Sequence, residues 1–144
     1  MSLTIELASE IADLLNSQNQ LAVRYAAEEI LANEDRYIVH SDNGRLLGVV
    51  EVKRVQWYQC EIDHLSVVEK RRGLGQSLLR DAEKRATDLG ASLCQCTIRV
   101  GNEASEGLFR ACGYALTAKF VNEQTGNVVG VYQKVLQAPA IGES

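Results

Sequence analysis

A glycine-rich turn separates an apolar strand from a helix at Lys70-Arg71-Arg72-Gly73-Leu74-Gly75-Gln76-Ser77-Leu78-Leu79. Such a turn directs several backbone N–H groups toward one point, and the helix after it adds unpaired N-terminal donors and the positive end of its dipole. Because these features together bind phosphate groups, the stretch predicts a pyrophosphate site. An ordinary helix start with a basic, solvated first turn is the alternative, and the surrounding sequence has to decide between them.

The glycine spacing differs from that of the two best-known phosphate loops. The sequence contains no G-x-x-x-x-G-K-[ST] pattern. The G-x-G-x-x-G dinucleotide fingerprint fails as well, because Leu78 stands where its third glycine belongs. A nucleoside triphosphate or NAD is therefore a weaker prediction than another ligand that contains a pyrophosphate.

A second motif follows about thirty residues downstream, at Asn102-Glu103-Ala104-Ser105-Glu106-Gly107-Leu108-Phe109-Arg110-Ala111-Cys112-Gly113-Tyr114. The first stretch resembles the acetyl-CoA signature [QR]-x-x-G-x-[GA] of the GNAT superfamily of N-acetyltransferases, with Lys70 in place of the usual glutamine or arginine. The second resembles the signature N-x-x-[AS]-x-x-L-[YF]-x-x-x-G-[FY] of the same family. Two signatures in this order and at this spacing are specific, and the resemblance extends over about residues 4–136.

Composition suits one compact domain. The chain has 144 residues, of which 46% are hydrophobic, and chains of this size bury about 68–70% of their unfolded surface. We therefore expect a single domain over residues 1–144, with a loose tail from about residue 137. No apolar run is long enough to cross a bilayer, and the first residues lack the basic and apolar regions of a secretory signal. The expectation is a cytoplasmic protein without a membrane partner.

Charge is distributed unevenly along the chain. The net charge is −4, which argues against a nucleic-acid partner. The local cluster of Lys70, Arg71, Arg72 and Arg80 is the exception, and a phosphate ligand accounts for positive charge at a helix start, where the dipole opposes it. An acidic remainder favours a cationic acceptor, such as an amine.

The cysteines predict neither a metal site nor a redox pair. Cys60, Cys94, Cys96 and Cys112 include no C-x-x-C spacing, so we expect no metal. Cys94 and Cys96 share one sheet face by the two-residue period of a strand, which favours packing. Cys112 remains the alternative case of a reactive thiol, if it borders the site.

Apolar periodicity and turn residues predict a mixed α/β (α+β) chain. The expected helices cover residues 4–16, 23–32, 76–89 and a short stretch between Asn102 and Gly113, and the expected strands cover residues 36–40, 45–55, 58–67, 92–100, 114–121 and 127–136. The resemblance implies the GNAT fold, a mostly antiparallel central sheet flanked by helices. Strands 58–67 and 92–100 would form its splayed parallel pair, which admits pantetheine. The family's usual first strand is expected to be missing or vestigial, since only Met1 to Leu3 precede the first helix.

The resemblance also implies a reaction, in which a primary amine directly attacks the thioester of acetyl-CoA and coenzyme A leaves as a thiolate. It aligns the backbone N–H of Leu65 with the family's oxyanion donor. The residues expected to bind the cofactor are Leu65, Ser66, Val67, Lys70, Arg71, Arg72, Gly73, Leu74, Gly75, Gln76, Ser77, Asn102, Ser105 and Phe109. A plain helix cap explains Asn102 equally well, and both roles are compatible.

The amine must lose a proton, which a carboxylate accepts directly or through water. Several family members carry this base at the positions of Gln59 and Glu61, and because a glutamine cannot serve, Glu61 is the first choice. Asp63 shares its face by strand alternation. The alternative is that these carboxylates only line a polar groove and recruit a cationic substrate. His64 points to the other face unless a strand bulge reverses it, and we interpret it as a structural histidine.

The leaving thiolate needs a proton donor, and the sequence does not identify it directly. Many relatives have a tyrosine where this chain has Phe109, and phenylalanine has no proton to donate. Tyr114 is the first substitute, and Tyr132, Cys112 and water are the other candidate donors. Alternatively, the thiolate leaves unassisted.

Phe109 also suits a different function, a non-catalytic acyl-CoA-binding or sensor module. A nucleotide-binding module unrelated to coenzyme A is a third hypothesis, and the sequence leaves both the identity of the amine and a homodimer open.

Overall fold

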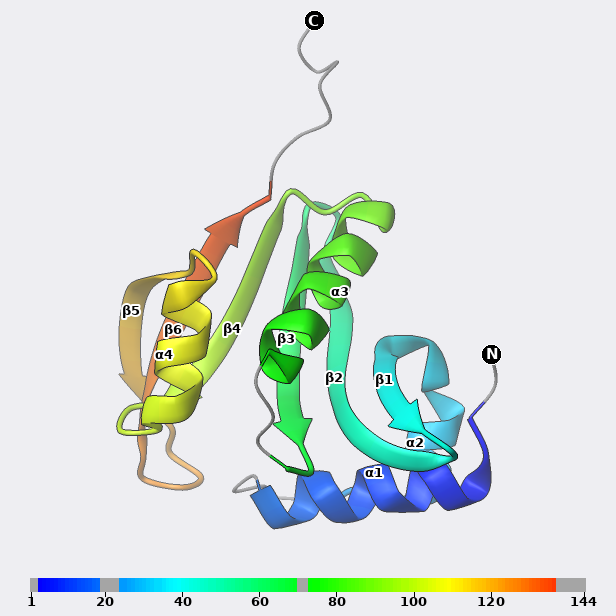
Figure 1. Ribbon diagram of the computed structural model, residues 1–144. Helices are drawn as coiled ribbons and strands as arrows, with labels where there is room; N and C mark the ends of the chain where they lie inside the picture. The colour runs from blue at the N-terminus through cyan, green and yellow to red at the C-terminus, as the bar shows by residue number, and fades with distance from the viewer. Residues whose placement is uncertain (1–2, 19–23, 70–72, 137–144) are drawn as a thin grey trace, which may run out of the picture. The chain divides into compact units, whose positions relative to one another are not determined.

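The computed structural model describes residues 3–18, 24–69 and 73–136 (Figure 1). The elements are α1 (Ile5–Gln18), α2 (Ala27–Ala32), a 3₁₀ turn (Glu34–Arg36), β1 (Tyr37–Asp42), β2 (Arg45–Gln56), β3 (Gln59–Val67), α3 (Leu74–Asp88), β4 (Leu93–Arg99), α4 (Glu103–Ala111), β5 (Ala115–Val121) and β6 (Val128–Val135). Their order is the predicted one, and the strands form a six-stranded mixed sheet in the order β1-β2-β3-β4-β6-β5. The predicted α/β class is confirmed.

Strand pairing follows the predicted hairpins and one parallel pair. β1 and β2 pair antiparallel, as do β4 with β6 and β5 with β6. The parallel ladder between β3 and β4 runs from Gln59↔Leu93 to Glu61↔Gln95, although β3 itself continues to Val67. By contrast, the β4–β6 ladder extends from Leu93↔Val135 to Arg99↔Val129.

The chain divides into two compact units, and the β2–β3 hairpin and α3 contribute to both. The first unit comprises Met1–Val52 and Asp63–Ala82, and the second comprises Lys53–Ile62 and Glu83–Ser144. A single domain over residues 1–144 stays a prediction. The predicted loose tail lies outside the described residues.

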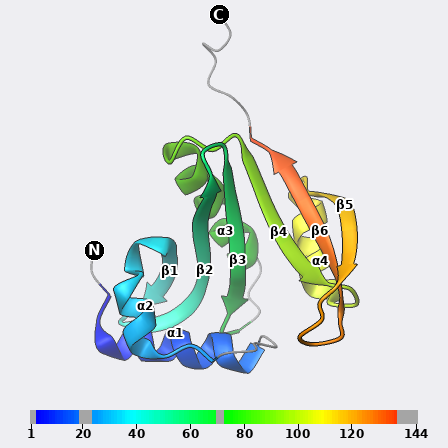
Figure 2. The same cartoon turned by 180° about the vertical axis from the view of Figure 1, so that it is seen from behind.

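The first unit is built around α1, whose buried residues follow the predicted helical spacing. Ala8, Ile11, Ala12 and Leu15 form a core cluster with Ile30, Tyr37, Leu46 and Val49. Figure 1 shows the first turns of α3 on one face of the neighbouring strands, and the reverse view in Figure 2 shows α2 on the opposite face of β1. The two helices therefore lie on opposite faces of this part of the sheet.

The second helix is shorter than predicted. The sequence predicts it over residues 23–32, whereas α2 begins at Ala27 and Ala26 is extended, with φ −118° and ψ 153°. The cause is a pair of hydrogen bonds to Asn16: the Tyr25 N–H donates to Asn16 Oδ1 at 2.8 Å, and Asn16 Nδ2 donates to the Tyr25 carbonyl at 2.9 Å. These bonds come from a different helix, so local sequence does not report them.

The second unit contains a sheet of β4, β6 and β5 with α4 on one face (Figure 1). Cys94 and Cys96 are buried there, which confirms the packing interpretation. Burial raises the pKa of the Cys94 thiol to about 12, so it stays protonated and unreactive at neutral pH. Cys112, at the end of α4, is half-buried.

Gly48 of β2 permits close packing against α3 and β3. A Cβ at this position would lie 2.8 Å from Leu78 Cδ1 and 3.1 Å from the backbone oxygen of Ser66. Since that oxygen belongs to a paired strand, Gly48→Ala is expected to lower the free energy of unfolding by about 1–2 kcal/mol, measured in urea. Gly107 of α4 has open space around its Cβ position, and Gly107→Ala is expected to stabilise by about 0.5–1 kcal/mol instead. Equal effects of the two substitutions would contradict the packing argument.

Candidate active site

The predicted cofactor loop leads from β3 into α3 in the first unit. Lys70, Arg71 and Arg72 lie outside the described residues. Gly73 has φ +81°, in the left-handed region that glycine adopts at little cost. The helix begins at the next residue, and the Ser77 N–H donates to the Gly73 carbonyl at 2.9 Å. Helix geometry leaves the N–H groups of this first turn available to an external acceptor, and the turn carries no carboxylate that would repel an anion.

β3 departs from regular geometry at His64. Its φ is +54°, a left-handed conformation that few non-glycine residues adopt. The sequence analysis kept a strand bulge at His64 as an alternative, and the backbone is indeed irregular there, immediately before Leu65. The His64 ring meets the Tyr25 ring edge to face, with centroids 5.4 Å apart and an interplanar angle of 82°. After it, Leu65 is half-buried and Ser66 is buried.

Tyr25 also contacts a buried carboxylate that the sequence interpretation missed. The Tyr25 hydroxyl donates to Glu51 Oε1 at 3.2 Å, and only 2% of Glu51 is exposed. Burial and the nearby Glu51 charge raise the pKa of Tyr25 to about 12, and the same causes raise the pKa of Tyr37, which lies opposite Glu51 in the β1–β2 ladder. Both hydroxyls therefore remain protonated donors at neutral pH. The available signal was the position of Glu51 between Val50 and Val52 in β2.

Glu61 ends a row of polar side chains that crosses three strands of the second unit. Gln133 Nε2 donates to Gln95 Oε1 at 2.7 Å, and Gln95 Nε2 lies 3.4 Å from Glu61 Oε1 as a donor. The ladders place these residues directly opposite one another. The two glutamines orient the Glu61 carboxylate, and neither was predicted. Asp63 is half-buried and belongs to the first unit, so its common face with Glu61 stays a prediction.

The second signature forms the start and core of α4. Asn102 is its N-cap, with Oδ1 accepting from the Ser105 N–H at 3.4 Å, so the capping interpretation is confirmed. Phe109 is buried, and its ring packs edge to face on Tyr114 with centroids 5.0 Å apart. Roles of Asn102, Ser105 and Phe109 in cofactor binding stay predictions.

Tyr114, the first predicted substitute for the missing proton donor, is buried and hydrogen-bonded. It is 4% exposed, and its hydroxyl donates to Glu83 Oε2 at 2.8 Å. Burial raises its pKa, and the neighbouring Cys94 and Glu83 raise the pKa further. Of the alternative donors, Tyr132 is 1% exposed and Cys112 is half-buried. The Tyr114 hydroxyl is thus bonded to Glu83, and its role as proton donor stays a prediction.

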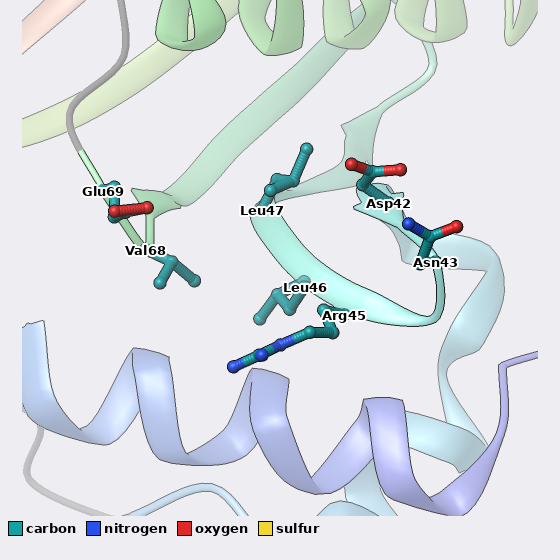
Figure 3. Close-up of a pocket in the computed structure, with 7 residues that line it drawn as sticks. All are labelled: Asp42, Asn43, Arg45, Leu46, Leu47, Val68 and Glu69. Carbon is teal, nitrogen blue, oxygen red and sulfur yellow. The ribbon is translucent and has the colours of Figure 1, made fainter.

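A pocket of about 330 Å³ lies in the first unit, between the β1–β2 turn and the end of β3 (Figure 3). The residues that line it are Asp42, Asn43, Arg45, Leu46, Leu47, Val68 and Glu69. These described residues include none of the predicted catalytic or cofactor-binding residues. The pocket therefore adds nothing to the candidate site.

The comparison with protein families decides what this arrangement belongs to. The model of the Acetyltransferase (GNAT) family matches residues 6–114, which include both signatures. The chain belongs to the GNAT family. No curated protein matches the chain by sequence.

Solved structures share the GNAT fold over nearly the whole chain. Salmonella typhimurium yncA, solved with its cofactor acetyl-CoA, has a TM-score of 0.80 and 20% identity, covering 97% of this chain and 94% of its own. The ribosomal-protein-alanine N-acetyltransferase of Brucella melitensis has a TM-score of 0.76 and 21% identity, covering 94% and 98%. An N-acetyltransferase of Staphylococcus aureus Mu50 has a TM-score of 0.78 and 19% identity, covering 95% and 97%. At these identities the likeness shows the fold.

Two further properties of this GNAT chain concern its described residues. They contain no group of three or more histidine, cysteine, aspartate or glutamate side chains arranged to hold a metal ion. Within the same ranges, every helix is too short or too polar to cross a membrane.

Proposed function

We propose that this GNAT chain moves the acetyl group of acetyl-CoA to a primary amine by direct attack on the thioester. The observation that carries the proposal is Gly73, a left-handed glycine at the N-terminus of α3 within the family's acetyl-CoA signature. The acetyl-CoA in the Salmonella structure and the alanine N-acetyltransferase from Brucella support the choice of donor and of an amine acceptor. The proposal includes a cytoplasmic location and leaves the particular amine open.

The proposed cofactor residues have two roles: most of them bind acetyl-CoA, and the Leu65 N–H polarises its thioester. The loop at residues 70–77 would bind the pyrophosphate through backbone N–H groups and basic side chains. Leu65, Ser66 and Val67 would bind the pantetheine arm, with the Leu65 N–H donating to the thioester oxygen as negative charge develops on it. Asn102, Ser105 and Phe109 are assigned to the cofactor by the family signature.

Glu61 is the proposed proton acceptor from the amine, with Asp63 as the second carboxylate. For Glu61→Gln we expect unchanged acetyl-CoA affinity, a kcat lower by about 10²-fold and a pH profile displaced to higher pH, because the amine must then lose its proton to solvent. Thiol release measured across pH checks this. Glu123→Gln makes the same charge change in the exposed β5–β6 turn and is expected to leave the profile unchanged. Wild-type kinetics in Glu61→Gln would exclude Glu61 as the base.

A non-catalytic acyl-CoA sensor is the second candidate function. Phe109 in place of a tyrosine and the Tyr114 hydroxyl bound to Glu83 both favour it, because phenylalanine has no proton to donate and the Tyr114 hydroxyl already donates to Glu83. Calorimetric titration with acetyl-CoA, coenzyme A and ATP, followed by thiol release with peptide and small-molecule amines, separates the functions. Binding with amine-dependent release supports the transferase, and binding without release supports the sensor. ATP binding without coenzyme A binding would support a nucleotide module.

A further inference from the structure

The backbone of β3 takes an unfavourable conformation at one residue. Among the described residues, only Asn43 and His64 have positive φ without being glycine. Asn43 lies in the β1–β2 turn, where asparagine commonly adopts this conformation. His64 instead lies within a strand. A histidine keeps such a conformation only where its surroundings favour it over the extended one. The contacts around His64 should therefore explain its conformation.

Tyr25 provides the ring contact at His64 and is itself fixed at three points. Its N–H and carbonyl both bond to the Asn16 side chain, at 2.8 and 2.9 Å. Its hydroxyl donates to Glu51 at 3.2 Å. These bonds fix Tyr25 to α1 and to β2, while its ring lies against His64 of β3. All four residues belong to the first unit.

Glu51 is the unusual member of this set. A buried carboxylate is costly to desolvate, and an apolar side chain of similar volume is often at least as stabilising. Its neighbours in β2, Val50 and Val52, are buried and apolar. The hydrogen bond that Glu51 accepts from Tyr25 therefore gives a reason for a carboxylate here: it specifies one position of the Tyr25 side chain.

We propose that Glu51, Tyr25 and His64 are positioning residues for acetyl transfer: the first two hold the third in its left-handed conformation, which directs the Leu65 N–H. The inference rests on the proposed function, in which that N–H binds the thioester oxygen. The peptide group between His64 and Leu65 carries the N–H, so the backbone torsions of His64 decide where it points. Because a misplacement of about 1 Å costs about 10²-fold in rate, this control has a measurable effect.

Substitutions at position 64 separate backbone conformation from imidazole chemistry. Glycine and asparagine adopt positive φ readily, alanine less readily, and a β-branched valine least. We expect His64→Gly and His64→Asn to keep kcat within about threefold of wild type, and His64→Val to lose about 10–100-fold. The acetyl-CoA KM should change by less than about threefold throughout, because the pyrophosphate loop is intact. An equal loss in all variants would show that the imidazole itself acts and would overturn the proposal.

The Tyr25–Glu51 bond is tested by a conservative pair of variants. Glu51→Gln keeps an oxygen that accepts from the tyrosine hydroxyl, and it is expected to keep near-wild-type kcat. Glu51→Leu and Tyr25→Phe both remove the bond, and each should lower kcat by about 5–20-fold, with the double variant no worse than either. Tyr58→Phe, in the β2–β3 turn, is the control. Losses in melting temperature without a change in kcat would show that the bond only stabilises the fold.

A readout independent of turnover distinguishes failure of this inference from failure of the proposed function. In ¹⁵N-labelled protein, acetyl-CoA is expected to shift the Leu65 amide resonance in wild type and in His64→Asn, and to shift it much less in His64→Val. Suppose that wild type binds acetyl-CoA without releasing thiol, and that the Leu65 shift is large in wild type and in His64→Asn but small in His64→Val. The transferase proposal then fails while the positioning stands. Equal shifts in all three proteins would overturn the positioning, whether or not the chain turns over.

Discussion

A protein carrying Gly73→Glu is expected to bind acetyl-CoA at least about 100-fold more weakly than the unchanged chain. Two physical effects add. Glutamate is strained at φ +81°, and the new carboxylate lies at the N-terminus of α3, where the pyrophosphate charge is expected. Calorimetric titration with acetyl-CoA measures the loss, and circular dichroism checks that the protein remains folded.

Matched glycine variants separate those two effects. Gly126 has φ +78° and open space around its Cβ position in the β5–β6 turn. Gly126→Glu therefore imposes the same strain and charge outside the loop, and it is expected to leave acetyl-CoA affinity unchanged. In Gly73→Asn, the asparagine tolerates the left-handed conformation and adds no charge, so the loss of acetyl-CoA affinity should be small. Unchanged affinity in Gly73→Glu would contradict the loop assignment, and an equal loss in Gly126→Glu would show general damage.

The order of elements could be predicted because the responsible signals are local. The turn at Ser41–Gly44 shows this: Asn43 and Gly44 have φ values of 52° and 78°, the conformation that the pair Asn-Gly favours between two strands. The length of α2 could not be predicted in this way. Tyr25, inside the predicted helix, is bonded to Asn16, nine positions upstream, and Ala26 after it is extended, so tertiary hydrogen bonds override the helical pattern.

The same distinction applies to the candidate site. Gly73 and the Asn102 cap follow from motifs in which the relevant residues are adjacent. The row from Glu61 through Gln95 depends instead on strand register, with partners 34 positions apart. The Tyr25–Glu51 bond joins residues 26 positions apart. Such contacts leave only indirect traces in a sequence, of which the Glu51 carboxylate between two valines of a strand is the clearest here.

Loss of the Glu83 carboxylate should produce the largest change in stability among the substitutions considered. Glu83 accepts from the Tyr114 hydroxyl at 2.8 Å and pairs with Lys134 Nζ at 3.0 Å. Glu83→Ala leaves a buried hydroxyl without its acceptor and a half-buried ammonium without its counter-ion. We therefore expect the free energy of unfolding in urea to fall by about 2–3 kcal/mol. Lys84→Ala, on the exposed side of the same helix, should change it by less than about 0.5 kcal/mol.

Tyr114→Phe then decides what the tyrosine does. It removes one hydrogen bond and leaves the Glu83–Lys134 pair intact, so a loss of about 1 kcal/mol is expected. Because the pKa of Tyr114 is raised above its unfolded value of about 10, its contribution should be complete below that pH and decrease above it. If thiol release with an amine is unchanged in the folded variant, Tyr114 is structural and the thiolate leaves with another donor or with none. If kcat falls by more than about tenfold at that modest cost in stability, Tyr114 is the proton donor, and its bond to Glu83 must break during the reaction.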